Sequence, residues 1–139
     1  MNAKLFIYPV IIKETYLDIF GHMNHATYLT LFEDARWEWV TQGGYGLKKM
    51  MATGIGPVVL EVKICYLKEL RLRDEIVIET QFISFEGKIG KFTQKMVRAG
   101  EVCCTAEFTF GLFDIKERKL ILPTSEWIQA IAGEVECKK

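Results

Sequence analysis

The side chains that can do chemistry gather in one short stretch, Asp18-Ile-Phe-Gly-His-Met-Asn-His-Ala-Thr-Tyr28. It holds both histidines of the chain, His22 and His25, with a carboxylate at Asp18 and a glycine at Gly21. Glycine lets the backbone approach a ligand closely, and a helix beginning nearby would present free N–H groups and a partial positive charge. This combination suits a reaction in which a carbonyl oxygen becomes negative, as in acyl transfer.

Asp18 has two chemical roles that the sequence does not separate. It can draw a proton from a water molecule, or it can attack the carbonyl itself and form an anhydride that water then opens. His25 can orient the substrate or hydrogen-bond the carboxylate. Structural roles compete with these, because an aspartate often closes a turn by bonding to the backbone two residues on, and Asn24 is well suited to cap a helix.

A metal site is a further alternative for the same stretch. Asp18, His22 and His25 carry carboxylate and imidazole groups, which suit zinc or iron. Their spacing is loose and no fourth ligand is evident, so we expect no metal. The glycines between 43 and 56 form no dinucleotide or phosphate-loop fingerprint, since no strand precedes them and no Lys-Ser/Thr closes the pattern. The sequence therefore predicts no cofactor.

Composition limits the class of protein. The chain has 139 residues, of which 50% are hydrophobic and 26% are charged, which predicts a single globular domain over residues 1–139. Lys plus Arg equals Asp plus Glu at 18 each, so no long-range positive field favours nucleic acid. No apolar run approaches the ~20 residues needed to cross a bilayer, and no cleavage signal follows the amino terminus. We expect a cytoplasmic protein without a membrane span.

The four cysteines have neither the spacing of a zinc ribbon nor that of a redox Cys-x-x-Cys motif. Cys103 and Cys104 are adjacent in an expected strand, so their side chains should point to opposite faces and not form a disulfide. Together with Cys65 and Cys137 they are expected to be reduced thiols, which fits a reducing cytosol.

One long helix is expected from His25 to Gln42, because apolar residues recur there at three- and four-residue steps. Asn24 is its expected cap, and Gly43-Gly44 is its expected end. The aromatic members of the apolar stripe are expected to fill the core rather than bind a ligand. The stripe consists of Tyr28, Leu31, Phe32, Ala35 and Trp39.

The rest of the chain is mostly strand-like. Strands are expected over residues 5–13, 58–68, 75–85, 89–98, 102–112 and 119–122, with a short amphipathic helix around Trp127, Ile128 and Ile131. The second of these strands should place Val58, Leu60, Val62, Ile64 and Tyr66 on one face. An antiparallel sheet with one apolar face needs a cover, and the long helix is the element that can supply it. The expected class is α+β, a curled antiparallel sheet wrapped around one long central helix, called the hotdog fold.

The motif Asp-x-x-Gly-His-Met-Asn-His-x-x-Tyr, followed by Leu-Phe-Glu-Asp-Ala-Arg-Trp-Glu, resembles the acyl-CoA thioesterases of the 4-hydroxybenzoyl-CoA thioesterase superfamily. It is similar in particular to the bacterial long-chain acyl-CoA thioesterase III group. The resemblance is close over residues 14–39 and looser over the later strands. His25 departs from the thioesterase III pattern, which has a second Asn there, whereas the related Tol-Pal-associated thioesterases have a histidine at this place.

The resemblance implies a function and roles for particular residues. Acyl-CoA would be hydrolysed to a free acid and CoA, with Asp18 in the catalytic position and His25 beside it. Backbone N–H groups near Asn24 and His25 would polarise the thioester carbonyl, and Tyr28 and Glu33 would support the site from the helix. Gly21 and His22 complete the expected substrate-positioning loop.

The resemblance also implies an active site between two protomers, hence a homodimer or a homotetramer, and CoA enters as part of the substrate. Two alternatives remain open from the residues: a non-catalytic hotdog module that binds acyl chains or a partner protein, and a hotdog hydratase or dehydratase. If the sheet buries the helix on all sides, Glu33 must be paired or hydrogen-bonded; if its face of the helix is exposed to solvent, Glu33 is a surface residue without a special role. Seven basic residues can meet CoA phosphates or simply cover a solvated face: Lys63, Lys68, Arg71, Arg73, Lys91, Lys95 and Arg98.

Overall fold

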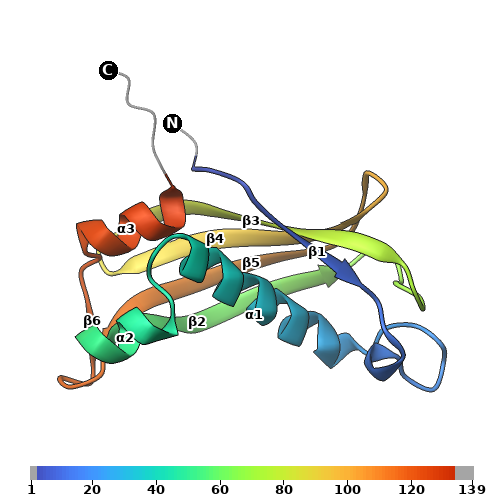
Figure 1. Ribbon diagram of the computed structural model, residues 1–139, viewed down its shortest axis with the longest axis horizontal. Coiled ribbons are helices and arrows are strands. Elements are labelled where there is room, and N and C mark those ends of the chain that lie inside the picture. The colour runs from blue at the N-terminus through green and yellow to red at the C-terminus, as the bar shows by residue number, and fades with distance from the viewer. Residues whose placement is uncertain (1–2, 134–139) are drawn as a thin grey trace.

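The computed structural model describes residues 3–133, so the expectation for Cys137 lies outside the described residues. The elements run in this order (Figure 1): β1 Phe6–Ile11, a 3₁₀ turn Glu14–Tyr16, α1 His25–Gln42, α2 Leu47–Thr53, β2 Ile55–Tyr66, β3 Glu75–Glu86, β4 Ile89–Arg98, β5 Glu101–Asp114, β6 Lys119–Ile121 and α3 Ser125–Ala132. The predicted strands and both predicted helices are present, and α1 has the predicted limits. α2 and the 3₁₀ turn are additional elements, in segments where we expected loops.

All of the strands belong to one antiparallel sheet. Its order is β1-β3-β4-β5-β2, and the short β6 pairs with β5. The helix α1 lies across one face of this curled sheet, with α2 and α3 near its carboxyl end (Figure 1). The predicted α+β architecture is confirmed.

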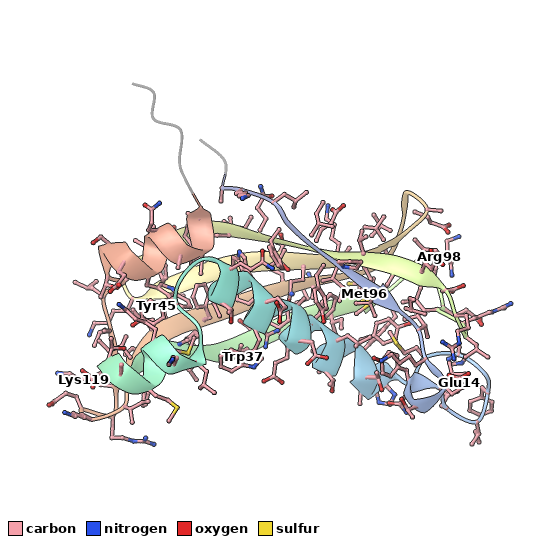
Figure 2. All side chains as sticks on the ribbon, in the orientation of Figure 1. Glu14, Trp37, Tyr45, Met96, Arg98 and Lys119 are labelled. Carbon is pink, nitrogen blue, oxygen red and sulfur yellow. The ribbon has the colours of Figure 1, made fainter. Side chains whose placement is uncertain are left out.

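The core lies between α1 and the inner face of the sheet (Figure 2). The predicted helix stripe is buried, with Phe32 and Ala35 fully covered and Trp39 6% exposed. Phe92 stacks on Phe108 at a centroid distance of 4.8 Å and packs against Trp39 at 5.4 Å. The aromatic residues of the predicted stripe are therefore buried in the core, as predicted, and this packing fixes where α1 lies on the sheet.

The prediction for β2 was wrong over its first half. A β-bulge between Val59 and Glu61 inserts an extra residue, Leu60, and shifts the alternation. Val59 pairs with the buried Phe110 and so shares the inner face with Val62, Ile64 and Tyr66, whereas Val58 pairs with Gly111 on the other face. A bulge of this kind leaves no mark in the hydrophobic pattern.

β2 is also the edge of the sheet, and its apolar side chains are open to solvent. Val58, Val59 and Leu60 are 37%, 41% and 47% exposed. Long hydrophobic edges are uncommon in monomeric proteins because their unpaired N–H and C=O groups can add another strand. The edge of β2 therefore has the character of a contact surface.

The cysteines described here, Cys65, Cys103 and Cys104, are free thiols. Cys104 is buried on the inner face as expected, but Cys103, from the polar face, is also fully buried. The chain after β2 covers it: the N–H groups of Leu67 and Lys68 both donate to the Cys103 carbonyl, at 2.9 and 3.0 Å. This crossing segment brings residues 67–69 towards the start of α1.

Candidate active site

A tight turn holds Asp18 just ahead of α1. The Gly21 N–H donates to the Asp18 carbonyl at 3.2 Å, and the Asp18 N–H donates to the His22 carbonyl at 3.0 Å. Gly21 has a φ of +85°, a left-handed conformation that glycine adopts without a steric penalty. Asp18 and His22 therefore face one another across the turn, and Gly21 acts through the backbone.

The two carboxylate oxygens of Asp18 have different surroundings. Oδ1 accepts the Phe20 N–H at 2.8 Å, which is the structural role that an aspartate commonly takes in turns. Oδ2 lies 3.6 Å from Nδ1 of His22, and the Asp18 side chain is only 22% exposed. Oδ1 therefore fixes the side chain in the turn, while Oδ2 accepts no backbone hydrogen bond. A structural role for Asp18 does not prevent a catalytic one.

The start of α1 is pinned from three sides. The Met23 N–H donates to the Leu70 carbonyl at 2.8 Å, and the Asn24 N–H donates to the Tyr16 carbonyl at 2.9 Å. The Asn24 side chain caps the helix by accepting the Ala26 N–H at 2.9 Å. Of the two N–H groups expected to polarise a carbonyl, that of Asn24 is thus already engaged.

The N–H of His25 remains. Among residues 3–133 it makes no hydrogen bond, and it is the first amide of α1. A free amide at this position adds its own dipole to the partial positive charge of the helix start. It is the group best placed here to donate a hydrogen bond to an oxyanion.

These residues open onto one cavity of about 300 Å³. Four of the predicted site residues line it, namely Asp18, His22, His25 and Tyr28, whereas Gly21 and Asn24 do not. Gly21 shapes the turn through its backbone, and Asn24 caps α1 with its side chain. The sequence did not place the opposite wall, which comes from the end of β2 and the crossing segment. That wall consists of Tyr66, Leu67, Lys68 and Glu69.

Tyr28 and Tyr66 form the floor of this arrangement. Their rings meet edge to face at 4.8 Å, and the Tyr66 hydroxyl donates to the His25 carbonyl at 3.1 Å. Burial, with the nearby Cys104 thiol, raises the pKa of Tyr28 to about 12, so its hydroxyl stays neutral. Tyr66 therefore connects β2 to the first turn of α1, and its signal in the sequence is only its place at the end of a strand.

Glu33 lies elsewhere. It is exposed and lines a separate cavity beside Arg36 and Trp37. Of the two environments left open for Glu33, buried with a partner or exposed to solvent, the structure shows the exposed one. Within one chain it does not meet Asp18, and its supporting role stays a prediction.

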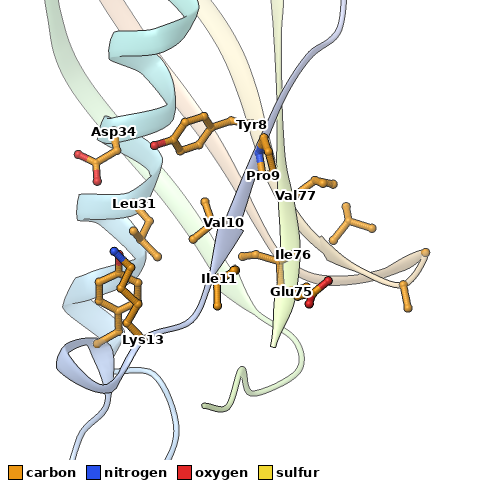
Figure 3. Close-up of a pocket in the computed structure, with 14 residues that line it drawn as sticks. Tyr8, Pro9, Val10, Ile11, Lys13, Leu31, Asp34, Glu75, Ile76 and Val77 are labelled. Atoms are coloured by element: carbon orange, nitrogen blue, oxygen red, sulfur yellow. The ribbon is translucent and has the colours of Figure 1, made fainter. Parts of the chain in front are cut away.

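No group of three or more His, Cys, Asp or Glu side chains in the described part of the chain is arranged to hold a metal ion. A larger hollow of about 810 Å³ surrounds the strand β1 (Figure 3). Its lining comes from both faces of the strand, because Tyr8 pairs with the buried Ile78 while Pro9 pairs with Val77 beside it. None of the residues that line it is a histidine. None of the helices among residues 3–133 is long and apolar enough to span a membrane.

Comparisons with known proteins identify the family of the chain. The model of the Thioesterase-like superfamily matches residues 13–131. The chain is 30% identical over 112 residues to the long-chain acyl-CoA thioesterase FadM of Escherichia coli (strain K12), covering 79% of this chain and 84% of that protein. It is 32% identical over 99 residues to the acyl-CoA thioester hydrolase YbgC of Escherichia coli O6:H1, covering 71% and 74%.

Solved structures give the same result for the fold. The crystal structure of YbaW, a probable thioesterase from Escherichia coli, superposes with a TM-score of 0.82 at 27% identity and covers 91% of this chain and 96% of that one. SAV2348 from Staphylococcus aureus, solved in complex with CoA, superposes with a TM-score of 0.86 at 20% identity over 95% and 84%. With a family model that matches residues 13–131 and relatives at 30% and 32% identity, this chain belongs to the thioesterase-like superfamily.

Proposed function

We propose that this chain hydrolyses acyl-CoA thioesters to a free carboxylic acid and CoA, with Asp18 as the catalytic carboxylate. The observation that carries the proposal is that two residues with unused groups line the same cavity: Asp18, whose Oδ2 accepts no backbone N–H, and His25, whose N–H makes no hydrogen bond within residues 3–133. Family membership and the activities named for FadM and YbgC support it.

The reaction follows from these two groups. The thioester carbonyl oxygen accepts the His25 N–H, which stabilises the negative charge that develops there. Asp18 Oδ2 takes a proton from water, whose oxygen attacks the carbonyl carbon; the C–S bond then breaks and CoA leaves as a thiolate that is reprotonated. In the alternative route Oδ2 attacks first, and water opens the resulting anhydride.

Neighbouring side chains tune the site without entering the bond changes. His22 lies beside Oδ2 and orients it, while His25 is placed to contact the substrate at the cavity wall. The neutral Tyr28 hydroxyl adds no charge that would compete with the thioester. Each step uses protein groups and water, so the proposal includes no metal and no cofactor, and it places the enzyme in the cytoplasm, where acyl-CoA is available.

The proposal includes a homodimer, alone or within a tetramer, formed by a second copy on the β2 edge. Val58, Val59 and Leu60 on that edge, and Leu29 and Trp37 on α1, are all more than a third exposed. Val59→Lys should give monomers in sedimentation velocity, while Ile83→Lys, at a similarly exposed apolar site on β3, should not. An unchanged dimer in the β2 variant would exclude this edge.

The activity is tested with a panel of acyl-CoAs that vary in chain length and include aromatic acids, following the release of free CoA. We expect saturable hydrolysis of at least part of the panel. Binding of acyl-CoA without any turnover would contradict the proposal and favour a carrier module.

A further inference from the structure

One wall of the Asp18 cavity is bound by a side chain that does not itself line the cavity. Arg98 is the last residue of β4, and its guanidinium reaches the chain that follows β2. Nη1 donates to the Glu69 carbonyl at 3.1 Å and to Oδ2 of Asp74 at 2.9 Å, and Nη2 donates to Oε1 of Glu101 at 3.2 Å. Arg98 therefore contacts both the cavity wall, at Glu69, and the turn that comes after it.

Asp74 extends this contact along the chain. Its Oδ2 also accepts the Arg71 N–H at 2.9 Å, and its own N–H donates to the Arg71 carbonyl at 3.1 Å. Burial would raise the pKa of Asp74, but the hydrogen bonds from the Arg71 N–H and from Arg98 outweigh burial and lower that pKa, so the carboxylate is charged at neutral pH. Residues 69–71, which we call the anchored segment, are thus bound at both ends.

The anchored segment in turn binds the loop that leads into α1. The Met23 N–H donates to the Leu70 carbonyl at 2.8 Å, and His22 forms an antiparallel bridge with Arg71. Leu70 is fully buried, so water does not compete for this contact. The anchored segment therefore pairs like a short strand with the loop that precedes the free N–H of His25.

The same loop continues to the catalytic carboxylate. The His22 carbonyl accepts the Asp18 N–H at 3.0 Å, and Nδ1 of His22 lies 3.6 Å from Oδ2 of Asp18. A chain of hydrogen bonds thus leads from Arg98 through the anchored segment to both groups that the proposed mechanism uses. A misplacement of about 1 Å can cost an enzyme about 10²-fold in rate, so the anchoring bears directly on catalysis.

We propose that Arg98, through Asp74 and the anchored segment, is a positioning residue that sets the spacing between the Asp18 carboxylate and the His25 N–H. The proposal rests on the proposed function, because it needs these two groups to act on a thioester. The nearby ion pairs are of another kind. Arg71 with Glu69 joins two exposed side chains, whereas Arg98 holds a backbone carbonyl and is only 27% exposed.

Arg98→Gln, which removes the charge and the fork of donors, tests the proposal. With the acyl-CoA that the parent hydrolyses fastest, kcat should fall about 10- to 100-fold. KM should change less than about threefold, since no residue that lines the cavity is altered. Arg98→Lys keeps a cation for Asp74 and should recover part of the loss, and Lys95→Gln, which removes an exposed cation from the same strand, should leave kcat unchanged.

A double variant separates positioning from a general loss of folded protein. In an Asp18→Asn background the carboxylate that Arg98 positions is gone, so Arg98→Gln should lower the residual rate by a factor at least about fivefold smaller than in the parent. A purely structural role would lower both rates by the same factor. If Arg98→Gln does not fold in urea denaturation controls, Asp74→Asn serves, because it keeps the size of the side chain and removes the charge that Arg98 meets.

Two results would overturn the positioning role: a folded Arg98→Gln enzyme with the kcat of an active parent, or equal factors in the two backgrounds. Failure of the proposed function would look different, because the parent itself would then turn over no acyl-CoA of the panel. The positioning role would fall with it.

Discussion

Replacing Asp18 by Asn tests the catalytic carboxylate with little change in structure. The amide oxygen of Asn can still accept the Phe20 N–H that Oδ1 accepts now at 2.8 Å, so the turn keeps its side-chain hydrogen bond. The atom in the Oδ2 position becomes an NH₂ group, which donates hydrogen bonds and can neither take a proton nor attack a carbonyl. The substitution therefore removes the chemistry and keeps the turn.

The magnitude follows from this separation. A positioned general base contributes about 10²- to 10⁴-fold, so kcat/KM should fall by that factor, or about 3–5 kcal/mol of transition-state stabilisation. The free energy of unfolding should change by less than about 1 kcal/mol, because no buried contact is lost. Asp34→Asn, which alters an exposed carboxylate on α1, is the matched control and should change neither quantity.

The assay follows CoA release with a thiol-reactive dye. Because Cys65 is an exposed free thiol and Cys137 is a further thiol of the sequence, each protein should carry Cys65→Ser and Cys137→Ser so that the dye reports on CoA. Chemical denaturation of the same samples gives the stability. An Asp18→Asn enzyme that retains most of the parent turnover would refute the reasoning, and so would a loss of activity that merely follows unfolding.

Three further outcomes are expected. Gly43→Ala would place a Cβ against the backbone carbonyl of Ala130 in α3, so the free energy of unfolding should fall by about 1–3 kcal/mol in urea denaturation. Tyr66→Phe removes the hydrogen bond to the His25 carbonyl and should cost about 0.5–1.5 kcal/mol in the same assay, with a fall in kcat as the helix start loosens. Burial raises the pKa of Tyr28 from 10.0 to about 12, so folding favours its neutral form. The free energy of unfolding should therefore fall by about 3 kcal/mol as the pH rises from 10 to 12, and Tyr28→Phe should remove this pH dependence.

The secondary structure was predictable where the hydrophobic period was long. α1 has five turns, a buried stripe and an Asn cap, and its limits follow from these features alone. α2 was missed because a helix of 7 residues shows too few turns for a period, and only Met50 in it is buried. The signal was in its composition, since Leu-Lys-Lys-Met-Met-Ala favours a helix, and Gly54 ends it with a φ of +73°.

The local part of the active site was predictable for a different reason. Asp18, His22 and His25 lie within eight consecutive residues, and a turn leading into a capped helix leaves few ways to arrange them. Which N–H group stays free was not predictable, because the N–H of Asn24 is taken by Tyr16 through a contact that depends on the preceding 3₁₀ turn. Tyr66 reaches the site only through the register of β2 on β5.

The cavity that Glu33 lines shows the limit of sequence reasoning most clearly. Arg36 lies within the helix motif and Trp127 within the last helix, and 91 residues separate them, so the cavity wall that they share beside Glu33 forms only once the sheet has closed. Arg36 donates to Oε1 of Gln94, a fully buried side chain on β4 that in turn donates to the Phe32 carbonyl. Replacing Arg36 by Met would leave that Oε1 without its donor, so the free energy of unfolding should fall by about 1–3 kcal/mol in urea denaturation.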